Sequence, residues 1–580
     1  MLNLCLNLRK QVNNLLIKPI GILPRYGAVF FFSAVLLTFA GFTSCGKEPV
    51  KHPEPKMPIQ VQSVTWDGNP VYLVRKNASV NPEVRISFSQ PLDTNSAKAN
   101  IKLMFNGISS VDQNVSFIQG DSTMVIRCKS PLKFFAKYTL PIPVLVKSRA
   151  GVTLDEHITI QIRTTYNKTP KFPRISQNDL LDSVQRRTIK YFWDFAHPVS
   201  GMARERNTSG DLVTSGGTGF GIMALVAATD RNFLNRSQVV QHLNKMTQFL
   251  WTKADQFHGV FPHWLSGSTG KTIPFSSNDD GADLVETSFL IQGLLSARNY
   301  FDQNSTDEIQ LRETIDSIWH RVEWDWFTKG GESNLYWHWS PNKGFVMNMT
   351  IRGWNECLIT HVLAASSPTH PVDSKVYHSG WARNGGIKNG RSFYGIKLPL
   401  GEDYGGPLFF SHYSFLGIDP NGLSDQYADY WEQNVNHSKI NHLYCKNNPK
   451  NQAGYGDSCW GLTASDIPNS YTASSPTNDR GVITPTAALS SFPYTPEQST
   501  KALEFFYYQL GDLIWKEYGF VDAFSIGDCW AASSFLAIDQ GPIAVMLENY
   551  RSGLLWKNFT AVPEVKSGMK KLGFQAPYLN

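Results

Sequence analysis

The hydrophobic pattern of this chain changes its period near residue 170, and this change limits what the chain can fold into. Between residues 58 and 168, short apolar segments alternate with period two, as in 84–89 and 157–163, and Asp, Asn, Gly and Pro turns separate them. From residue 175 onward, apolar residues recur at helical spacing. A chain of 580 residues is also too long for one ordinary core. The sequence therefore predicts an all-β domain followed by an all-α domain.

The strand-like residues 58–168 predict a small β-sandwich of about seven strands. Residues 175–580 show no βα alternation, and loops rich in Gly, Trp, Tyr and Asn separate their helices. These features favour an (α/α)6 barrel, in which paired helices surround one axis and their loops crowd one end. An α-solenoid is the alternative, but no repeat of roughly 34 or 40 residues is visible. The predicted helices span residues 182–195, 219–232, 237–256, 283–301, 306–327, 355–365, 424–436, 496–518 and 541–556.

The N-terminal 57 residues have the composition of an export signal followed by a linker. Four basic residues precede an apolar run, residues 28–42, and small residues then lead to Cys45. The run is shorter than a typical membrane-spanning helix. We predict a signal peptide at 1–44, a lipid-modified Cys45 and a Pro-rich tether at 45–57, with an uncleaved anchor as the alternative. The expected localisation is that of an exported outer-membrane lipoprotein, which contacts the membrane through its lipid alone.

Charge and cysteine spacing exclude several classes of protein. Removal of residues 1–44 lowers the net charge from +6 to +2, because that segment has four basic and no acidic residues. The remaining chain has no basic stripe of the kind that phosphate backbones require, so we expect no nucleic-acid partner. No pair of cysteines has zinc-finger spacing. Cys445 and Cys459 flank a Gly- and Asn-rich loop and are candidates for a disulfide in an oxidising compartment.

One segment, residues 278–287, concentrates carboxylates ahead of an apolar helical pattern. Asp279, Asp283 and Glu286 are spaced at i, i+4 and i+7, which would place them on one face of a helix start. A solvated helix face normally interleaves Lys or Arg at such spacings, and this segment has none. N-capping is the simpler explanation of an acid at a helix start, and it suits Asp280 best and Glu286 least. The pattern indicates a functional site.

Carboxylates are the best candidates for chemistry, because the chain has no Gly-x-Ser-x-Gly and no catalytic-cysteine context. Hydrolysis of a glycosidic bond needs a protonated acid at the leaving oxygen and a second carboxylate on the opposite face of the sugar. Side chains at i and i+4 of a helix are only about 5–6 Å apart, so an acid from another element is required. Glu356 is our candidate, since it opens a predicted helix beside Trp354 and Asn355. Crowding raises the pKa of such carboxyls and keeps one protonated.

Aromatic residues make up 13% of the chain, and many lie in loops beside polar side chains. Flat apolar faces next to hydrogen-bonding groups suit sugar rings, although about half of these side chains are expected to pack the loops. The histidines lack HExxH or other ligand spacing, so we expect no metal and no cofactor. The candidate substrate-binding residues in these loops are His263, Trp264, Trp337, Trp339, Arg352, Trp354 and Trp460.

Four motifs occur in one order: DDGADLVETSFLIQGLL at 279–295, YGDSCWGLTASDIP at 455–468, PTAALSSFPYTPEQS at 485–499 and AIDQGPIAVMLENYRSGLLWK at 537–557. Together they resemble glycoside hydrolase family 144, the β-1,2-glucanases with a glycoamylase-like domain. The resemblance implies an (α/α)6 barrel that hydrolyses β-1,2-glucan or its oligosaccharides, releasing sophoro-oligosaccharides with inversion.

The same resemblance implies roles for individual residues. Asp279, Asp283, Glu286 and Glu356 fall where the essential acids of that family lie, with the acid and the base not distinguished. Asp539, in the last of the four motifs, is implied to make structural or substrate contacts.

The phrase VRISFSQPLD, residues 84–93, is similar to bacterial Ig-like domains found beside secreted enzymes. It contains no acid cluster or aromatic platform, so we expect a spacer. Two alternatives stay open: an enzyme of the same fold that acts on another polysaccharide, including a lyase, and a glycan-binding lipoprotein without catalysis. A lyase would need a Tyr or His base near Arg and Lys, and acids outnumber bases in the candidate motifs. Endo and exo attack are not distinguished, and we expect a monomer.

Overall fold

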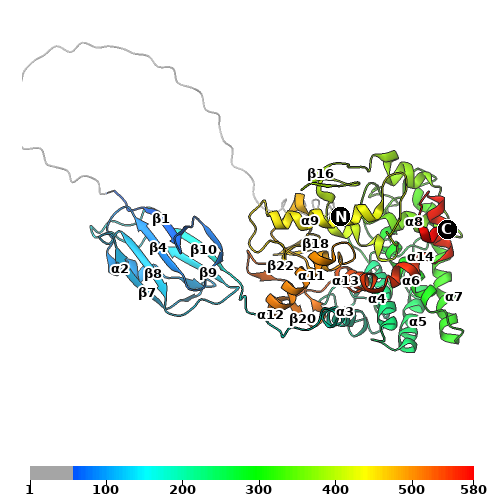
Figure 1. Cartoon of the computed structure of the whole chain (residues 1–580), viewed down its shortest axis with the longest axis horizontal. Coiled ribbons are helices and arrows are strands. Elements are labelled where there is room, and N and C mark those ends of the chain that lie inside the picture. Colours follow the sequence, from blue (N-terminus) through cyan, green and yellow to red (C-terminus); the bar gives the residue numbers. More distant parts are fainter. Residues whose placement is uncertain (1–56) are drawn as a thin grey trace, which may run out of the picture. The chain divides into compact units, whose positions relative to one another are not determined.

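The computed structural model describes residues 57–580, which form two compact units, the larger of which contains residues 161–580 (Figure 1). The predicted signal peptide, the predicted lipidation site Cys45 and all but the last residue of the predicted tether lie outside the described residues. Within residues 57–580, no helix is both long enough and apolar enough to cross a membrane.

The first domain consists of two five-stranded sheets, as the period-two pattern predicts. One sheet has the strand order β2-β1-β4-β8-β7 and the other β3-β10-β9-β5-β6, with β3 and β10 paired in parallel. Alternate residues of β4 and β10 are buried, so that side chains such as Ile86 and Ile162 fill the core. The strands are β1 (Val61–Trp66), β2 (Asn69–Pro70), β3 (Val74–Ala78), β4 (Glu83–Phe88), β5 (Met104–Phe105), β6 (Ser109–Ser110), β7 (Gln113–Ile118), β8 (Thr123–Cys128), β9 (Lys137–Ile142) and β10 (Ile158–Thr164), and one helix, α2 (Thr94–Asn100), accompanies them.

The second domain is helical, with short strands in its long loops. Its α-helices are α3 (Gln177–Trp193), α4 (Ser215–Asp230), α5 (Arg236–Thr252), α6 (Leu284–Tyr300), α7 (Thr306–Arg321), α8 (Leu358–Ser366), α9 (Tyr430–Asn447), α10 (Pro485–Leu489), α11 (Pro496–Glu504), α12 (Gly511–Ile514), α13 (Ala537–Ser552), α14 (Leu554–Thr560) and α15 (Pro563–Lys571). The short strands are β11 (Leu212–Thr214), β12 (Trp264–Ser266), β13 (Thr272–Ile273), β14 (Ala282–Asp283), β15 (His338–Trp339), β16 (Ser392–Phe393), β17 (Ile396–Lys397), β18 (Ala464–Ile467), β19 (Ser470–Ala473), β20 (Trp515–Lys516), β21 (Gly519–Phe520), β22 (Phe524–Ser525) and β23 (Trp530–Ala531).

Four predicted helices differ from the observed ones for local reasons. The helix predicted at 541–556 is divided at Gly553, whose φ of 68° ends α13. The helix predicted at 306–327 ends at Arg321, and a 3-10 turn follows because Trp324 and Phe327 both turn into the core. The helix predicted at 496–518 is broken into α11, a π-turn and α12. The helix predicted from residue 424 begins at Tyr430, because Asp429 caps it by accepting a 2.8 Å hydrogen bond from the Glu432 N–H.

Helices α4 and α6 are buried on nearly all sides and approach each other closely. A Cβ at Gly219 would lie 2.0 Å from the Phe289 carbonyl oxygen, and one at Gly293 would lie 2.2 Å from the Gly219 carbonyl oxygen. Only glycine permits this approach of two backbones. The α4–α6 pair therefore forms a rigid centre that fixes both helix starts.

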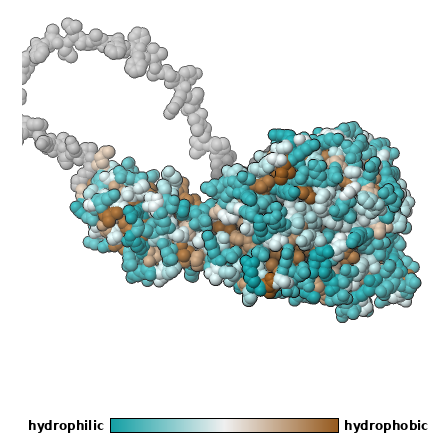
Figure 2. All heavy atoms as spheres, viewed as in Figure 1, coloured by the Kyte–Doolittle hydropathy of each residue, from teal (hydrophilic) through white to brown (hydrophobic). Residues whose placement is uncertain are grey.

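Hydrophilic side chains cover most of the face of the molecule seen in Figure 2.

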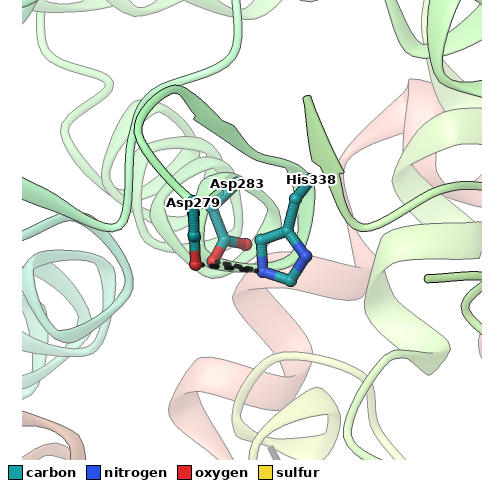
Figure 3. A group of neighbouring side chains, drawn as sticks. All are labelled: Asp279, Asp283 and His338. Carbon is teal, nitrogen blue, oxygen red and sulfur yellow. Dashed lines mark ion pairs between the residues drawn. The ribbon is translucent and has the colours of Figure 1, made fainter. Parts of the chain in front are cut away.

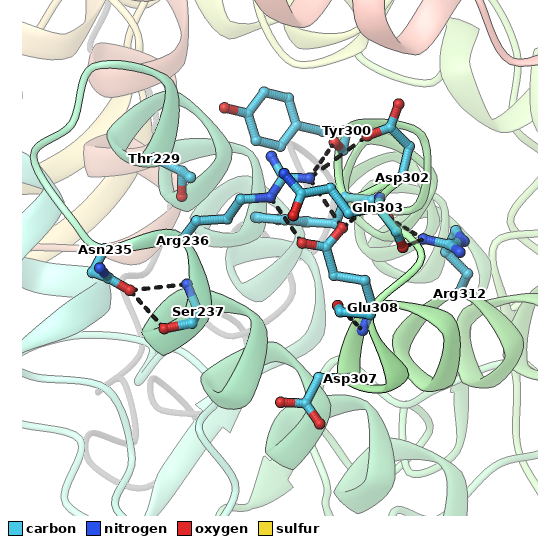
Figure 4. A network of polar contacts seen from close by, with 12 residues as sticks. Thr229, Asn235, Arg236, Ser237, Tyr300, Asp302, Gln303, Asp307, Glu308 and Arg312 are labelled. Carbon is cyan, nitrogen blue, oxygen red and sulfur yellow. Dashed lines mark hydrogen bonds and ion pairs between the residues drawn. The ribbon is translucent and has the colours of Figure 1, made fainter.

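A polar network ties the other end of α6 to α5 and α7 (Figure 4). Arg236, at the start of α5, donates two hydrogen bonds to Glu308 of α7, at 2.8 and 3.0 Å, and one of 3.1 Å to the Tyr300 carbonyl oxygen at the end of α6. Burial would raise the pKa of Glu308, but the Arg236 bonds hold it below its ordinary value. This network lies about 20 Å along α6 from Glu286, at 1.5 Å per residue, so it stabilises the scaffold without touching the candidate site.

Candidate active site

Asp283 is the residue that caps α6. Its Oδ1 accepts hydrogen bonds from the backbone N–H groups of Val285 and Glu286, at 3.1 and 3.0 Å. The helix begins at Leu284, so Asp279 lies in the preceding turn and the predicted helix face of three acids does not exist as such. The capping role expected for Asp280 is also wrong, because that side chain accepts a 2.9 Å hydrogen bond from the Asn342 amide. The carboxyl groups of Asp279 and Asp283 nevertheless lie close together, because both approach the same histidine, His338.

A pair of short strands brings a histidine to the acids. Strand β14 pairs antiparallel with β15, which places His338 opposite Asp283. The His338 Nε2 lies 3.4 Å from the Asp279 Oδ2 and 3.7 Å from the Asp283 Oδ2 (Figure 3). A second imidazole, that of His263, donates through Nδ1 to the Asp283 Oδ2 at 3.1 Å. Both carboxylate oxygens of Asp283 are therefore occupied by hydrogen-bond donors.

Glu286 is seated against the start of α4. Its Oε2 accepts a 3.1 Å hydrogen bond from the Gly216 N–H. A Cβ at Gly216 would lie 2.2 Å from that same oxygen, so glycine is required for the carboxyl to reach the helix end. Burial, opposed by His263 and reinforced by Asp283, raises the pKa of Glu286 to about 7.

Glu356 comes from a different element, two residues before α8, and the structure brings it together with the acids of α6. It is 6% exposed, and burial raises its pKa to about 7. The charge of Asp283 further raises the pKa of Glu356, and the charge of Glu356 raises the pKa of Glu286. An acid from another element thus completes the cluster of Asp279, Asp283, Glu286 and Glu356.

His263 holds one of the four acids, Asp283, as an anion, while burial raises the pKa of the other three. Burial would lower the pKa of His263, but Glu286, Asp283 and Asp279 raise it to about 9, so the ring is an imidazolium near neutrality. Burial would raise the pKa of Asp283, but the His263 hydrogen bond holds it below its ordinary value. Burial and the charge of Asp283 raise the pKa of Asp279 to about 7. Groups with such separated pKa values are suited to acid–base chemistry.

His338 is the neutral member of the group, because burial lowers its pKa to about 4. Its Nδ1 is buried and has no hydrogen-bond partner among residues 57–580. One ligand atom each from Asp279, Asp283 and His338 lies within 4.8 Å of the others, a spacing that could hold a metal ion. Two oxygens and one imidazole nitrogen form a donor set that divalent metals accept, and the remaining coordination positions would have to come from water or substrate.

The predicted sugar-contacting aromatics divide into buried and accessible side chains. Trp460 is fully buried, and its Nε1–H donates to the Gln498 carbonyl oxygen at 3.2 Å, which corrects the expectation of a sugar contact there. Trp354 is 7% exposed and packs against Trp381. Trp337 is 6% exposed and stacks on the His338 ring. The predicted residues that remain partly or largely exposed are His263, Trp264, Trp339 and Arg352.

Comparison with known proteins decides the family. Residues 348–563 match the glycoamylase family model, described as "Putative glucoamylase", and residues 59–165 match the bacterial Ig-like domain. The solved endo-β-1,2-glucanase of Chitinophaga pinensis is 52% identical, with a TM-score of 0.68, over 70% of this chain and 100% of that chain. The chain belongs to glycoside hydrolase family 144, the β-1,2-glucanases.

Two further proteins named for β-1,2-glucan or its oligosaccharides are similar to this family 144 chain. The solved β-1,2-glucanase of Parabacteroides distasonis is 36% identical, with a TM-score of 0.67, over 89% of this chain and 73% of that chain. An exo β-1,2-glucooligosaccharide sophorohydrolase acting at the non-reducing end, also from Parabacteroides distasonis, is 45% identical over 421 residues, or 69% of this chain. The match spans 58% of the length of that curated relative.

The family 144 domain contains a second group of buried acids that sequence reasoning largely missed. Asp466, in strand β18, accepts hydrogen bonds from Arg206 at 3.2 Å and from Ser534 at 2.6 Å. The Asp522 Oδ2 accepts from the Asp466 N–H at 2.7 Å. Burial, and next the charge of Asp466, raise the pKa of Asp522 to about 7. Burial, and next the charge of Asp522, raise the pKa of Asp539 well above its ordinary value.

Asp539, the substrate-binding candidate, therefore faces another carboxyl group. Neither of its carboxyl oxygens accepts a hydrogen bond from a described residue, and its contact with Asp522 raises the pKa of Asp539 while it lowers that of Asp522, so Asp539 is the carboxyl that holds the proton. Tyr413 lies within electrostatic reach of both acid groups. Burial is the largest cause of its raised pKa, and the charges of Asp539, Glu356 and Glu286 raise that pKa further. Asp466 could have been found in the motif at 455–468, whereas Asp522 carries no signal in the sequence.

Cys445 and Cys459, the candidates for a disulfide, are both free and buried in the structure, which corrects that expectation.

Proposed function

We propose that this family 144 protein hydrolyses β-1,2-glucan or β-1,2-gluco-oligosaccharides to short sophoro-oligosaccharides. The observation that carries the proposal is the cluster of four buried acids, of which Asp283 is held ionised by His263 while Asp279, Glu286 and Glu356 carry protons near neutrality. The related proteins named for β-1,2-glucan or its oligosaccharides support the substrate class.

The hydrogen bonds suggest how the work is divided among the acids. Both oxygens of Asp283 already accept hydrogen bonds, so this side chain acts as a fixed anion rather than as a proton carrier. Glu356 is assigned as the general acid, because burial keeps it protonated and it stands on a separate element. The base that activates water is assigned to Asp279 or Glu286 in its ionised form, which a pKa of about 7 leaves populated at neutral pH. Inversion requires a spacing of about 6.5–9.5 Å between acid and base, which leaves room for that water.

The remaining features of the proposal concern the surroundings of the site. We infer that the helices of residues 175–580 close into an (α/α)6 barrel and that residues 58–168 are a spacer domain. The sequence pattern supports export with cleavage after residue 44, lipidation of Cys45, a tether at 45–57, attachment to the outer membrane through lipid alone, and a monomer without cofactor or nucleic acid. Endo and exo attack both occur among the named relatives.

The test is product analysis with defined glucans. Linear β-1,2-glucan should be shortened, while β-1,3-glucan and α-1,4-glucan should stay intact, as followed by chromatography of the products. Random product sizes indicate endo attack, and a single disaccharide indicates exo attack. Binding of β-1,2-glucan without any shortening would identify a glycan-binding protein and refute the proposal, and an unsaturated product absorbing in the ultraviolet would identify a lyase.

A further inference from the structure

Trp326 is the one exposed tryptophan of the described residues 57–580. It lies in the 3-10 turn Trp324–Thr328 that follows α7, and it is 42% exposed, whereas Trp324 and Phe327 of the same turn are completely buried. Covering the exposed part of an indole with the apolar face of a ligand releases free energy. An exposed side chain of this size is consistent with a binding role.

Neighbouring rings hold Trp326 in one orientation. The His258 ring lies parallel to it, with a centroid distance of 3.8 Å and an interplanar angle of 13°. His258 is fixed in turn by Glu323, which accepts a 2.8 Å hydrogen bond from its Nδ1. The Trp339 ring stands edge-on to both, 5.0 Å from His258 and 6.5 Å from Trp326. We name Trp326, His258 and Trp339 the aromatic platform.

The platform is adjacent to the acid cluster through β15. Trp339 follows His338, whose Nε2 lies 3.4 Å from Asp279. Successive side chains of a strand point to opposite faces, so His338 faces the acids and Trp339 faces away from them toward Trp326. The platform therefore lies on the other face of this two-residue strand from the acids, and a sugar chain has to pass over the strand to reach it.

The surroundings of the platform suit a sugar ring. Asp325 accepts a 3.1 Å hydrogen bond from the His370 Nδ1, and Glu323 lies on the other side at His258. A pyranose has CH groups that pack on a flat aromatic face and hydroxyl groups that bond to carboxylates and imidazoles at its edge. Resting on the proposed function, we propose that the platform binds a glucosyl residue of a long β-1,2-glucan outside the acid cluster, so that it sets a preference for long chains.

The test compares Trp326→Ala with wild type on long β-1,2-glucan and on the shortest oligosaccharide that is cleaved. Aromatic contacts contribute about 0.5–1.5 kcal/mol, so KM for the long chain should rise about 2- to 12-fold with kcat unchanged. The short substrate does not reach the platform, and its kcat/KM should stay constant. Trp326→Tyr should recover most of the loss. Tyr550→Ala removes a side chain that is 37% exposed near the far end of α13 and is the matched control.

Two outcomes would overturn the inference: an unchanged KM for the long chain, or an equal loss on both substrates. Thermal melting of each variant separates a folding defect from lost binding. If wild type cleaves no β-1,2-glucan, the proposed function has failed, and the platform is then tested by itself. In that case affinity electrophoresis in β-1,2-glucan gels should show retardation of wild type and not of Trp326→Ala, and equal mobility of the two would reject the platform.

Discussion

Replacing Gly216 by alanine tests how closely Glu286 must approach the start of α4. The new Cβ would lie 2.2 Å from the Glu286 Oε2, whereas non-bonded atoms need about 3.5 Å, so the carboxyl group must retreat by about 1 Å. Its 3.1 Å hydrogen bond to the Gly216 N–H is then lost. A hydrogen bond to a charged group contributes about 1.5–3 kcal/mol, and we expect kcat on β-1,2-glucan to fall about 10- to 150-fold.

The fold should survive this substitution. Alanine favours a helix over glycine by about 1 kcal/mol, while the crowding costs about 1–3 kcal/mol, so the free energy of unfolding should change by less than about 2 kcal/mol. Gly456→Ala is the matched control, because a Cβ there meets nothing within 4 Å, and its kcat should equal that of wild type. A Gly216→Ala enzyme within twofold of wild type, with an unchanged pH profile, would refute the reasoning about Glu286.

Three further predictions concern the same acids. Asp283→Asn removes the anion beside His263 but keeps an Oδ1 that can cap α6, so we expect a loss of more than about 100-fold in kcat and a change of less than about 1 kcal/mol in unfolding free energy, measured by kinetics and urea denaturation. Because the pKa of Glu356 is raised to about 7 from an ordinary 4.5, the folded protein binds the extra proton, and the stability that this gives is present below pH 4.5 and lost as the pH rises to 7. Glu356→Gln should therefore melt increasingly above wild type between pH 5 and pH 8, and a constant difference in Tm would contradict this. Treatment with a chelator should leave kcat unchanged, and loss of activity restored by a divalent cation would show that Asp279, Asp283 and His338 hold a metal.

The sequence was sufficient for the two domain types and for the four acids of the first cluster. The change of hydrophobic period reports which face of each element is buried, and carboxylates without counter-charges are unusual on a solvated helix. It was not sufficient for the capping residue. Any of three aspartates could cap α6 by its spacing, and the choice of Asp283 depends on where β14 pairs with β15, which is a long-range contact.

The aromatic residues show the same limit. Trp460 and Trp326 both stand in loops beside polar residues, yet one is completely buried and the other is 42% exposed. Loop sequences do not determine burial, because the packing of distant helices decides which side of a turn faces the core. Asp522 was missed for a related reason, since it joins Asp466 and Asp539 only after residues far apart in the chain have packed together.

The proposed mechanism requires that this family 144 protein inverts the anomeric centre while Glu356 donates a proton to the leaving oxygen. Proton NMR of linear β-1,2-glucan during the first minutes of reaction follows both the anomer formed and the rate. Wild type should produce the α-anomer first, and Glu356→Gln, matched to Glu332→Gln at a more exposed glutamate, should produce almost none of it. Appearance of the β-anomer first would rule out inversion, and near-full turnover by Glu356→Gln would rule out Glu356 as the proton donor.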